Sequence, residues 1–470
     1  MTKVLENVKD IVWGAPARVL ILGIGIWLTV KTGFAQFRLF PLSCRRFLDQ
    51  LKPQKKDGIS PFQALCTALA ATVGTGNIAG VAGAMAIGGP GAIFWMWICG
   101  FLGMALKYAE AALAVRYRVR NRDGEFVGGP MYMIREGLGR RWLWLAVLYS
   151  FFGVAAAFGV GNATQVNAVI SGIGQVIEAF GGTVTRQGNL LLGVFLGILV
   201  AVMLLGGAKR IGKIAEQLVP FAAVVYLLLS LGVLIARFQA IPAAFAAILQ
   251  GALSPRAVTG GVIGSAFQAL RVGVSRGVFT NEAGMGTASM AHAGAEVDHP
   301  AQQGLMGIME VFLDTIVICT MTALVILCSG VGIPYGVDVG AELTMDAFSS
   351  VYGNWVLAVI ALELCCFAFA TILGWGLYGA RCAQFLLGES VWKPFALLQA
   401  VTVVVSALLE TGTVWTLSEI FNGLMAIPNL IALGALSPEL IRLTHEFDQK
   451  PGGRAARGGT YENFHQRQPL

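Results

Sequence analysis

The residues best suited to bind a ligand are four in a row, Gly74-Thr75-Gly76-Asn77, at the centre of an apolar stretch over residues 61–88. Glycine lowers the cost of leaving the helical conformation, so this sequence predicts a break between two half-helices. Each half has about 11 residues, or roughly 16 Å of helix, which puts the break near the middle of a bilayer. Carbonyls at one half-helix end can bind a cation or an ammonium group, and N–H groups at the other can bind a carboxylate. The alternative is an unbroken glycine-rich helix that packs closely on its neighbours.

A second stretch of this kind, GVIGSAFQALRVGVSRG, covers residues 261–277. It predicts a second break over residues 264–273, with Gln268 and Gly273 as ligand-binding residues. The two stretches are five spans apart, and because five is odd, the second half of the chain would be inverted relative to the first. Interrupted helices at matching positions of two inverted repeats are typical of transporters with a binding site at the membrane midplane.

Polar side chains inside apolar spans are a third group of candidates, because they are costly in lipid and must face a partner. Asn162 and Gln165 are three residues apart, which predicts that they share one helix face. They either contact a ligand or join two helices. Glu310 and Asp314 are four apart and are candidates for proton sensing or gating. The alternative is pairing with an intramembrane base such as Arg271 or Lys107.

These residues belong to a chain of 470 residues that is 56% hydrophobic and only 13% charged. Such values exclude an ordinary soluble protein and a disordered chain, and 60 glycines without a triplet repeat exclude collagen. Nucleic-acid binding is also disfavoured, because the basic residues lie in short loops between apolar spans. The composition predicts an all-α polytopic membrane protein. Hydropathy predicts eleven transmembrane helices over residues 13–30, 61–88, 91–114, 143–176, 190–206, 214–236, 257–277, 303–330, 354–379, 394–410 and 413–434.

The distribution of lysine and arginine predicts the orientation in the membrane. When the segments between spans alternate, 26 of these residues fall on one side and 6 on the other, with Lys107 inside a span. The positive-inside rule then puts the N-terminus outside and the C-terminus in the cytoplasm. The predicted organisation is an extra helix and basic loop (1–57), a five-helix repeat (58–256), its inverted copy (257–440) and a cytoplasmic tail (441–470).

Enzyme chemistry is not expected. The eight cysteines form no CxxC pair, so neither a disulfide framework nor a zinc site is predicted. No nucleophile elbow or phosphate-binding loop is found either.

Six blocks of sequence resemble, in family order, the alanine/glycine:cation symporter family. They are GTGNIAGVAGAMAIGGPGAIFWMW (74–97), GGPMYMI (128–134), GNATQVNAV (161–169), RGVFTNEAGMG (276–286), FAFATILGWGLYGARC (367–382) and LMAIPNLIAL (424–433). The resemblance implies a leucine-transporter-like fold and sodium-coupled import of small neutral amino acids, alanine and glycine. The chain departs from the family pattern at Ala370, where a hydroxyl residue is usual, and at Ala380, where glutamate is frequent.

The resemblance also implies roles for individual residues. The N–H groups of Thr75 and Gly76 would bind the substrate carboxylate, and the carbonyls of Thr72 and Val73 would face the ammonium group or a cation. Gly74 lies between these two sets, and Asn77 either contacts the bound ligands or caps the second half-helix. The expected sodium ligands are the carbonyls of Ala70 and Val73 and the Thr371 hydroxyl. Trp375 would wall the pocket or pack in the interior.

Sodium is the only ion or cofactor expected, and the partners are the amino acid and the lipid bilayer, with a monomer as the simplest state. Within transport, the alternative is proton coupling or exchange through Glu310 or Asp314. A channel is less favoured, because no repeated carbonyl filter or ring of charges is found.

Overall fold

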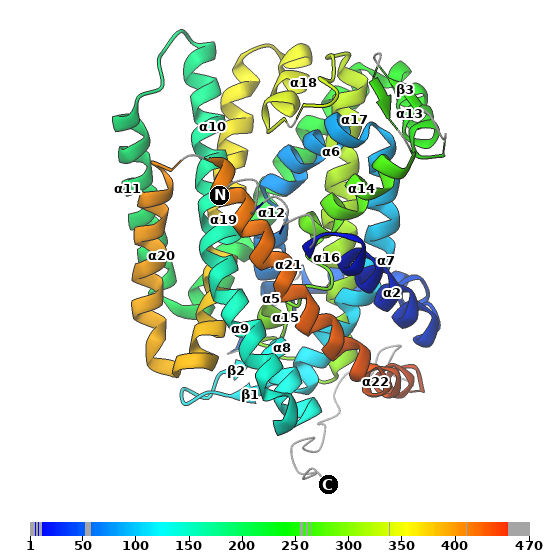
Figure 1. Cartoon of the computed structure of the whole chain (residues 1–470), viewed down its shortest axis with the longest axis vertical. Coiled ribbons are helices and arrows are strands. Elements are labelled where there is room, and N and C mark those ends of the chain that lie inside the picture. The colour runs from blue at the N-terminus through cyan, green and yellow to red at the C-terminus, as the bar shows by residue number, and fades with distance from the viewer. Residues whose placement is uncertain are drawn as a thin grey trace.

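A computed structural model describes residues 12–51, 58–253, 257–259, 262–264, 266–337, 339–409 and 411–449, together with Leu5 and Val8. Its regular structure is helical apart from two short β-hairpins (Figure 1). The N-terminal part contains α2 (Ala15–Lys31), α3 (Ala35–Arg38) and α4 (Phe40–Gln50).

The first group of spans contains α5 (Pro61–Thr72) with α6 (Val81–Gly88), α7 (Gly91–Arg116), α9 (Leu143–Phe158) with α10 (Thr164–Ala179), α11 (Arg186–Leu204) and α12 (Gly207–Ala236). The second contains α14 (Ala266–Asn281) with α15 (Ser289–His292), α16 (Pro300–Val311) with α17 (Thr320–Ser329), α19 (Trp355–Leu387), α20 (Trp392–Ser406) and α21 (Thr411–Ala435). The connecting elements are β1 (Val119–Arg120), β2 (Phe126–Val127), α8 (Pro130–Tyr132), α13 (Ile241–Leu253), β3 (Ala257–Thr259), β4 (Val262–Gly264) and α18 (Glu342–Tyr352), and α22 (Ser437–Gln449) follows the last span.

Seven helices of the described chain are long and apolar enough to cross a membrane. The segments Pro61–Thr72 and Gly76–Gly88 make an eighth span that is bent by 53° at its break. The other three predicted spans correspond to α2, α14 and α20, which have 17, 16 and 15 residues. The prediction of an all-α polytopic membrane protein is confirmed, with a helix at each of the eleven predicted positions.

The prediction is wrong in detail around the start of the second repeat. Residues 257–264 were expected to be helical, but β3 and β4 pair there as an antiparallel hairpin, and α14 begins only at Ala266. The helix then runs without interruption to Asn281, so the break predicted over residues 264–273 is not there. The β-branched residues Val258, Thr259, Val262 and Ile263 suit short strands at least as well as a helix.

Two further differences concern the ends of spans. Arg271 and Arg276 lie with Arg18 around one cavity, at the end of the molecule where α2 begins. They therefore lie at the end with few basic residues, which changes the distribution from 26 against 6 to 24 against 8 and does not reverse it. The segment predicted as a tail from residue 441 is helical up to Gln449 in α22, and the rest of it lies outside the described residues.

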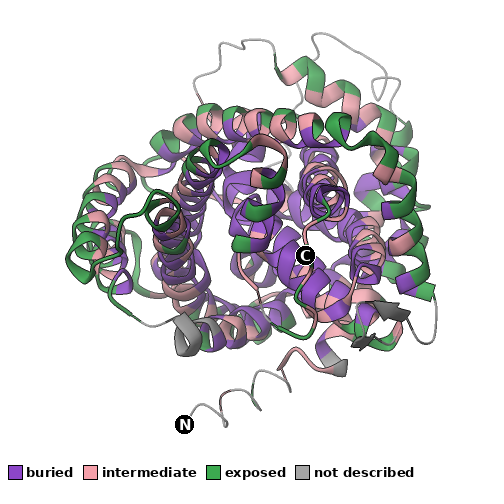
Figure 2. Cartoon of the chain, turned by 90° about the horizontal axis from the view of Figure 1, so that it is seen from above, coloured by how far each residue is buried: buried purple, intermediate pink, exposed green. Residues whose placement is uncertain are grey.

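The helices surround a buried interior, and exposed residues lie on the rim when the molecule is seen from above (Figure 2). Glycines bring α7 very close to its neighbours α14 and α16. A Cβ on Gly273 would approach the Trp95 Cβ to 2.7 Å, and one on Gly307 would lie 2.6 Å from the Lys107 carbonyl oxygen. Only glycine permits such approach of helix backbones, so these contacts fix α7 against both partners.

Three spans contain a π-helical segment: η1 (Gly76–Gly80), η4 (Gly159–Ala163) and η6 (Phe312–Cys319). Each segment carries one of the polar candidates, Asn77, Asn162 or Asp314. A π-helical turn contains an additional residue, which rotates the side chains that follow it, and such turns are frequent at functional sites. The three segments therefore mark the part of the fold in which to look for a site.

Candidate functional site

The predicted break in the first span is present. The helix α5 ends at Thr72, and Val73 adopts an extended conformation with ψ 99°. The Asn77 side chain closes the turn, because its Oδ1 accepts a hydrogen bond of 2.8 Å from the N–H of Gly74. Thr75 and Gly76 begin the second half-helix, where no preceding turn supplies acceptors for their N–H groups. Asn77 therefore closes the turn from within the second segment, whose N-cap residue Thr75 makes no side-chain cap hydrogen bond. The break lies between the carbonyl end of α5 and the N–H end of this segment.

Oxygen atoms gather beside this break. The Oγ1 of Thr371, on α19, lies 2.9 Å from the carbonyl oxygen of Ala70 and 2.9 Å from that of Phe367. Two of the three expected sodium ligands are thus neighbours, and the third, the Val73 carbonyl, is at the end of the same half-helix. The Phe367 carbonyl was not among the predicted ligands, although it lies one helical turn before Thr371. A hydroxyl and several carbonyls are hard oxygen donors of the kind that a sodium ion requires.

Gly74 lies directly against this group. A Cβ at this position would be 2.7 Å from the Thr371 Oγ1 and 3.8 Å from Oε1 of Gln165. The first distance is shorter than a Cβ can tolerate, so any other residue at position 74 would displace the Thr371 hydroxyl from its place beside the break. Gly76 is in a different environment, because its Cβ would lie 3.2 Å from the Cγ2 of Thr280 on α14.

The two predicted amides behave differently. Gln165 contacts the break, since its Oε1 accepts a hydrogen bond of 3.1 Å from the Thr75 hydroxyl. Asn162 instead donates from Nδ2 to the Gln399 carbonyl of α20, at 2.9 Å. The expectation that the two share a face is wrong, because Asn162 lies in the π-helical segment η4 and Gln165 lies beyond it. Asn162 joins two helices here, which is the alternative that its sequence left open.

Thr72, Gln268 and Gly273 do not join this group. The Thr72 hydroxyl donates to the Ala68 carbonyl of its own helix at 3.2 Å. Gln268 is exposed and donates to the Ile87 carbonyl at 2.7 Å, which connects α14 to the end of α6. Gly273 packs against α7, as described above. Gln268 and Gly273 were predicted to bind ligand as parts of a break over residues 264–273, but α14 is continuous there.

The second interruption comes after α14, at residues 282–288. Glu282 has a positive φ of 53°, which is uncommon for a residue other than glycine, and Gly284 and Gly286 also have positive φ. Glu110 of α7 holds this loop, because its Oε1 accepts hydrogen bonds from the N–H groups of Gly284 and Gly286 at 2.9 and 3.0 Å. It accepts a third, of 2.8 Å, from Nδ2 of Asn429 on α21. The protein's own carboxylate thus satisfies the N–H groups at this break.

Trp375 connects the second break to α19. Its side chain is fully buried, and its Nε1 donates to Oε1 of Glu282 at 2.9 Å. The other oxygen of Glu282 accepts a hydrogen bond of 2.6 Å from the Thr287 hydroxyl. Trp375 thus makes one hydrogen bond to the loop through its ring nitrogen. Its ring also packs directly on Gly161, where a Cβ would overlap it.

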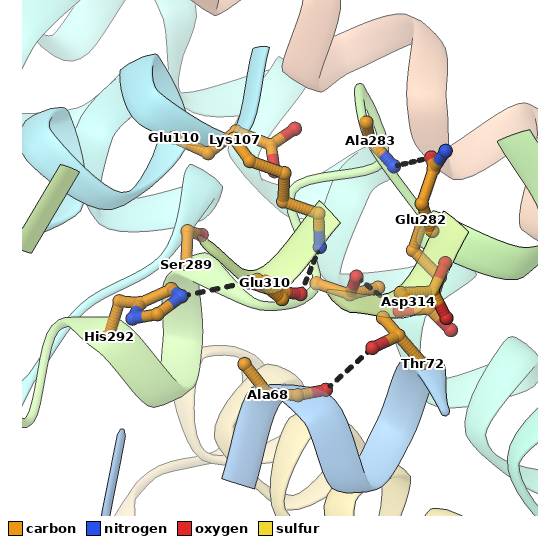
Figure 3. Close-up of polar contacts among 12 residues, drawn as sticks. Ala68, Thr72, Lys107, Glu110, Glu282, Ala283, Ser289, His292, Glu310 and Asp314 are labelled. Carbon is orange, nitrogen blue, oxygen red and sulfur yellow. Dashed lines mark hydrogen bonds and ion pairs between the residues drawn. The ribbon is translucent and has the colours of Figure 1, made fainter. Parts of the chain in front are cut away.

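Buried charges lie between the two breaks (Figure 3). The Lys107 Nζ lies 2.8 Å from Oε1 of Glu310, and Nε2 of His292 lies 2.9 Å from the other oxygen. Gln303 contacts the second ring nitrogen of this histidine at 2.7 Å. The expectation that Glu310 pairs with an intramembrane base is confirmed, with Lys107 as its partner.

We expect removal of Lys107 alone to destabilise the protein. In Lys107→Met the Glu310 carboxylate would remain buried without its cation, a change that typically costs about 3–5 kcal/mol. The free energy of unfolding, or the melting temperature in detergent, would measure the loss. The double variant Lys107→Met/Glu310→Gln removes both charges and should recover most of it. Equal destabilisation by both variants would mean that packing of the lysine chain, rather than charge pairing, stabilises this region.

Comparison with known proteins agrees with these features. Residues 1–457 match the model of the sodium:alanine symporter family. The chain is 42% identical over 450 residues to the sodium/alanine symporter AgcS of Methanococcus maripaludis, covering 95% of this chain and 97% of that protein. It is also 42% identical, over 95% of this chain and 96% of the relative, to an uncharacterized transporter of Haemophilus influenzae.

Among solved structures, the fold resembles that of MhsT in complex with L-phenylalanine. The TM-score is 0.57 at 15% sequence identity, with 84% of this chain and 99% of the other covered. At this identity the similarity shows the fold alone. It agrees with two five-helix repeats that each open with an interrupted helix, after the additional helix α2.

Proposed function

The chain belongs to the sodium:alanine symporter family, and from this premise we propose that it imports small neutral amino acids, alanine and glycine, together with sodium. The protein is a multi-pass membrane transporter, not an enzyme. In the proposed cycle, the site between α5 and α19 at the first break opens to one side of the membrane, closes around its ligands and then opens to the other side. The proposed orientation keeps the N-terminus outside and the C-terminus in the cytoplasm, with the two repeats meeting near residue 257.

The observation that carries the proposal is the position of Thr371 between two carbonyl oxygens at the break, at 2.9 Å from each. With the Val73 carbonyl, these atoms supply four oxygens from two separate helices. A cation bound there would hold α5 and α19 together, and its departure would release them. Cation binding is thereby coupled to the contact between the two helices, which is the requirement for coupled transport.

The neighbouring residues support an amino acid as the substrate. The N–H groups of Thr75 and Gly76 are suited to its carboxylate, and the Thr75 hydroxyl is already held by Gln165. These side chains are buried, with Thr75 at 2% and Gln165 at 4% exposure. The close packing favours a substrate with a small side chain.

Uptake of radiolabelled alanine and glycine into proteoliposomes tests the proposal. We expect concentrative uptake with an inward sodium gradient and none when choline replaces sodium. Saturation of the rate, and counterflow of labelled alanine, would distinguish a carrier from a channel. Equal uptake with and without sodium, at every external pH, would contradict the proposed coupling.

The proposed role of Trp375 in size selection has its own test. Trp375→Ala should admit a larger side chain such as leucine and weaken the affinity for alanine, because it empties space between α19 and the second break. Trp375→Phe keeps most of the ring but removes the bond to Glu282, so it is the matched control. Competition of unlabelled leucine against alanine uptake measures the change. An unchanged selectivity in a folded Trp375→Ala protein would make this tryptophan a packing residue only.

A further inference from the structure

Asp314 lies where the two interrupted spans meet α16, and none of the described cations pairs with it. Its side chain is fully buried within the π-helical segment η6. Oδ1 accepts a hydrogen bond of 2.7 Å from Nδ2 of Asn77, and Oδ2 accepts one of 2.7 Å from the Thr315 hydroxyl. The Thr315 oxygen in turn accepts from Nδ2 of Asn281, the last residue of α14, at 3.1 Å. Asp314 therefore connects the first break, through Asn77, with the start of the second, through Asn281.

The charges around Asp314 do not balance. The ionisable groups near it in the described part of the chain are themselves buried, and Lys107 is the one permanent cation among them. The groups that act on Asp314 are Lys107 on α7, Glu310 on α16 and the Cys319 thiol on η6; beyond them lie Glu110 on α7, Glu282 after α14 and His292, which contacts Glu310. Lys107 is already paired with Glu310, so an ionised Asp314 would be an uncompensated charge inside the membrane. In this structure the Asp314 carboxylate therefore needs a bound cation, either a proton or a metal ion, to neutralise it.

The hydrogen bonds favour a proton over a metal cation for that charge. The orientation of the Asn77 amide is fixed, because its Oδ1 accepts from the Gly74 N–H and its Nδ2 must then face Asp314. An amide donor turned toward the carboxylate repels a cation, whereas sodium requires several oxygens turned inward. These oxygens are found instead at Thr371, on the other side of the break.

We propose that Asp314 is a proton-binding site that takes up and releases one proton in each transport cycle, in addition to the cation bound beside Thr371. In the closed arrangement the buried carboxyl is neutral and hydrogen-bonded to Asn77. When the site opens to the inside, water reaches the carboxyl and stabilises its ionised form, so the proton is released on that side. The carboxyl takes up the next proton from the outside, when the empty carrier has returned to the outward-facing state and closes around alanine, so that each cycle moves one proton inward. The inference rests on the proposed amino-acid transport and adds a second ligand to it.

The test measures proton movement and sodium movement in the same vesicles. Proteoliposomes that contain a pH-sensitive dye, clamped at zero membrane potential, receive alanine with an inward sodium gradient, and the uptake of labelled sodium is followed in parallel. For the unmodified protein we expect an alanine-dependent change of internal pH. One linked proton would also change the half-saturation constant for alanine by up to about tenfold per pH unit.

Asp314→Asn keeps the shape and the contact with Asn77 but cannot titrate, so it should abolish both proton effects while sodium-driven uptake persists. Asp346→Asn, which makes the same change at an exposed site on α18, is the matched control and should behave as the unmodified protein. If Asp314→Asn keeps the proton signal, or raises the sodium requirement without changing the pH dependence, the assignment is wrong. If this variant fails to insert, the unmodified protein still decides the matter, since the absence of any alanine-dependent proton movement would overturn the inference. Proton movement without any sodium dependence would instead contradict the proposed sodium coupling and leave this inference standing.

Discussion

Alanine uptake is expected to be lost when Gly74 is replaced by valine. The new Cβ would lie 2.7 Å from the Thr371 Oγ1, so the Thr371 hydroxyl must turn away from its position or the break and α19 must separate. Over-packing of this kind typically costs about 1–3 kcal/mol. Since about 1.4 kcal/mol corresponds to a factor of ten, the sodium affinity should fall by roughly fivefold to a hundredfold. Initial rates of uptake at several sodium concentrations would measure the loss.

The same segment supplies a control for this variant. A Cβ on Gly80 would have an ordinary contact of 3.9 Å with Thr280, so Gly80→Ala should retain uptake. Gly76→Leu should also abolish uptake, but for another reason, because its side chain would push against Thr280 on α14. Near-normal uptake by a correctly inserted Gly74→Val protein would show that the break and α19 do not form one site.

The first break could be predicted from sequence because its cause is local. Two glycines, a threonine and an asparagine fall within four residues at the centre of a span, and Asn77 closes the turn with the N–H of Gly74, only three residues away. No distant part of the chain is needed to form it. The sodium ligands followed from the resemblance to a family, and Thr371 does meet Ala70 across 301 residues.

The second break could not be placed in this way, because long-range contacts hold it. The loop after α14 adopts positive φ at Glu282 and is fixed by Glu110, 174 residues away from Gly284 in sequence. Polar residues over 264–273 resembled a break in composition, although α14 is continuous there. The motif NEAGMG, with its acid and two glycines, was the available signal.

The face of Asn162 was also beyond prediction, for a different reason. The spacing rule for residues three apart assumes a regular α-helix, but Asn162 lies within the π-helical segment η4 and Gln165 lies after it, in α10. The extra residue of that turn directs Asn162 toward α20 while Gln165 faces Thr75. Irregular turns of this type follow from tertiary packing, which a single sequence does not display.

Loss of the Thr371 hydroxyl should raise the sodium concentration needed for half-maximal uptake. In Thr371→Ala the cation would keep the carbonyls of Ala70, Val73 and Phe367, but it would lose the one side-chain oxygen expected among its ligands. One ligand of this kind is worth about 1 kcal/mol, as for a typical net hydrogen bond, which corresponds to roughly fivefold in affinity. The loss also frees the Ala70 carbonyl from its contact with α19, so fivefold is the smallest effect expected. Uptake measured against sodium concentration, at fixed pH and alanine, gives the value.

Two matched variants separate the oxygen from the shape of the side chain. Thr371→Ser keeps the hydroxyl and should behave nearly as the unmodified protein, whereas Thr371→Val keeps the volume and should behave as Thr371→Ala. Ala370→Ser introduces a hydroxyl at the position where the family resemblance implies one. It should lower the sodium requirement, because the neighbouring position on α19 would add an oxygen to the same site. If Thr371→Val and Ala370→Ser both keep the sodium curve of the unmodified protein, the cation does not bind on this helix. The coupling would then have to be sought at Asp314, on the other side of the break.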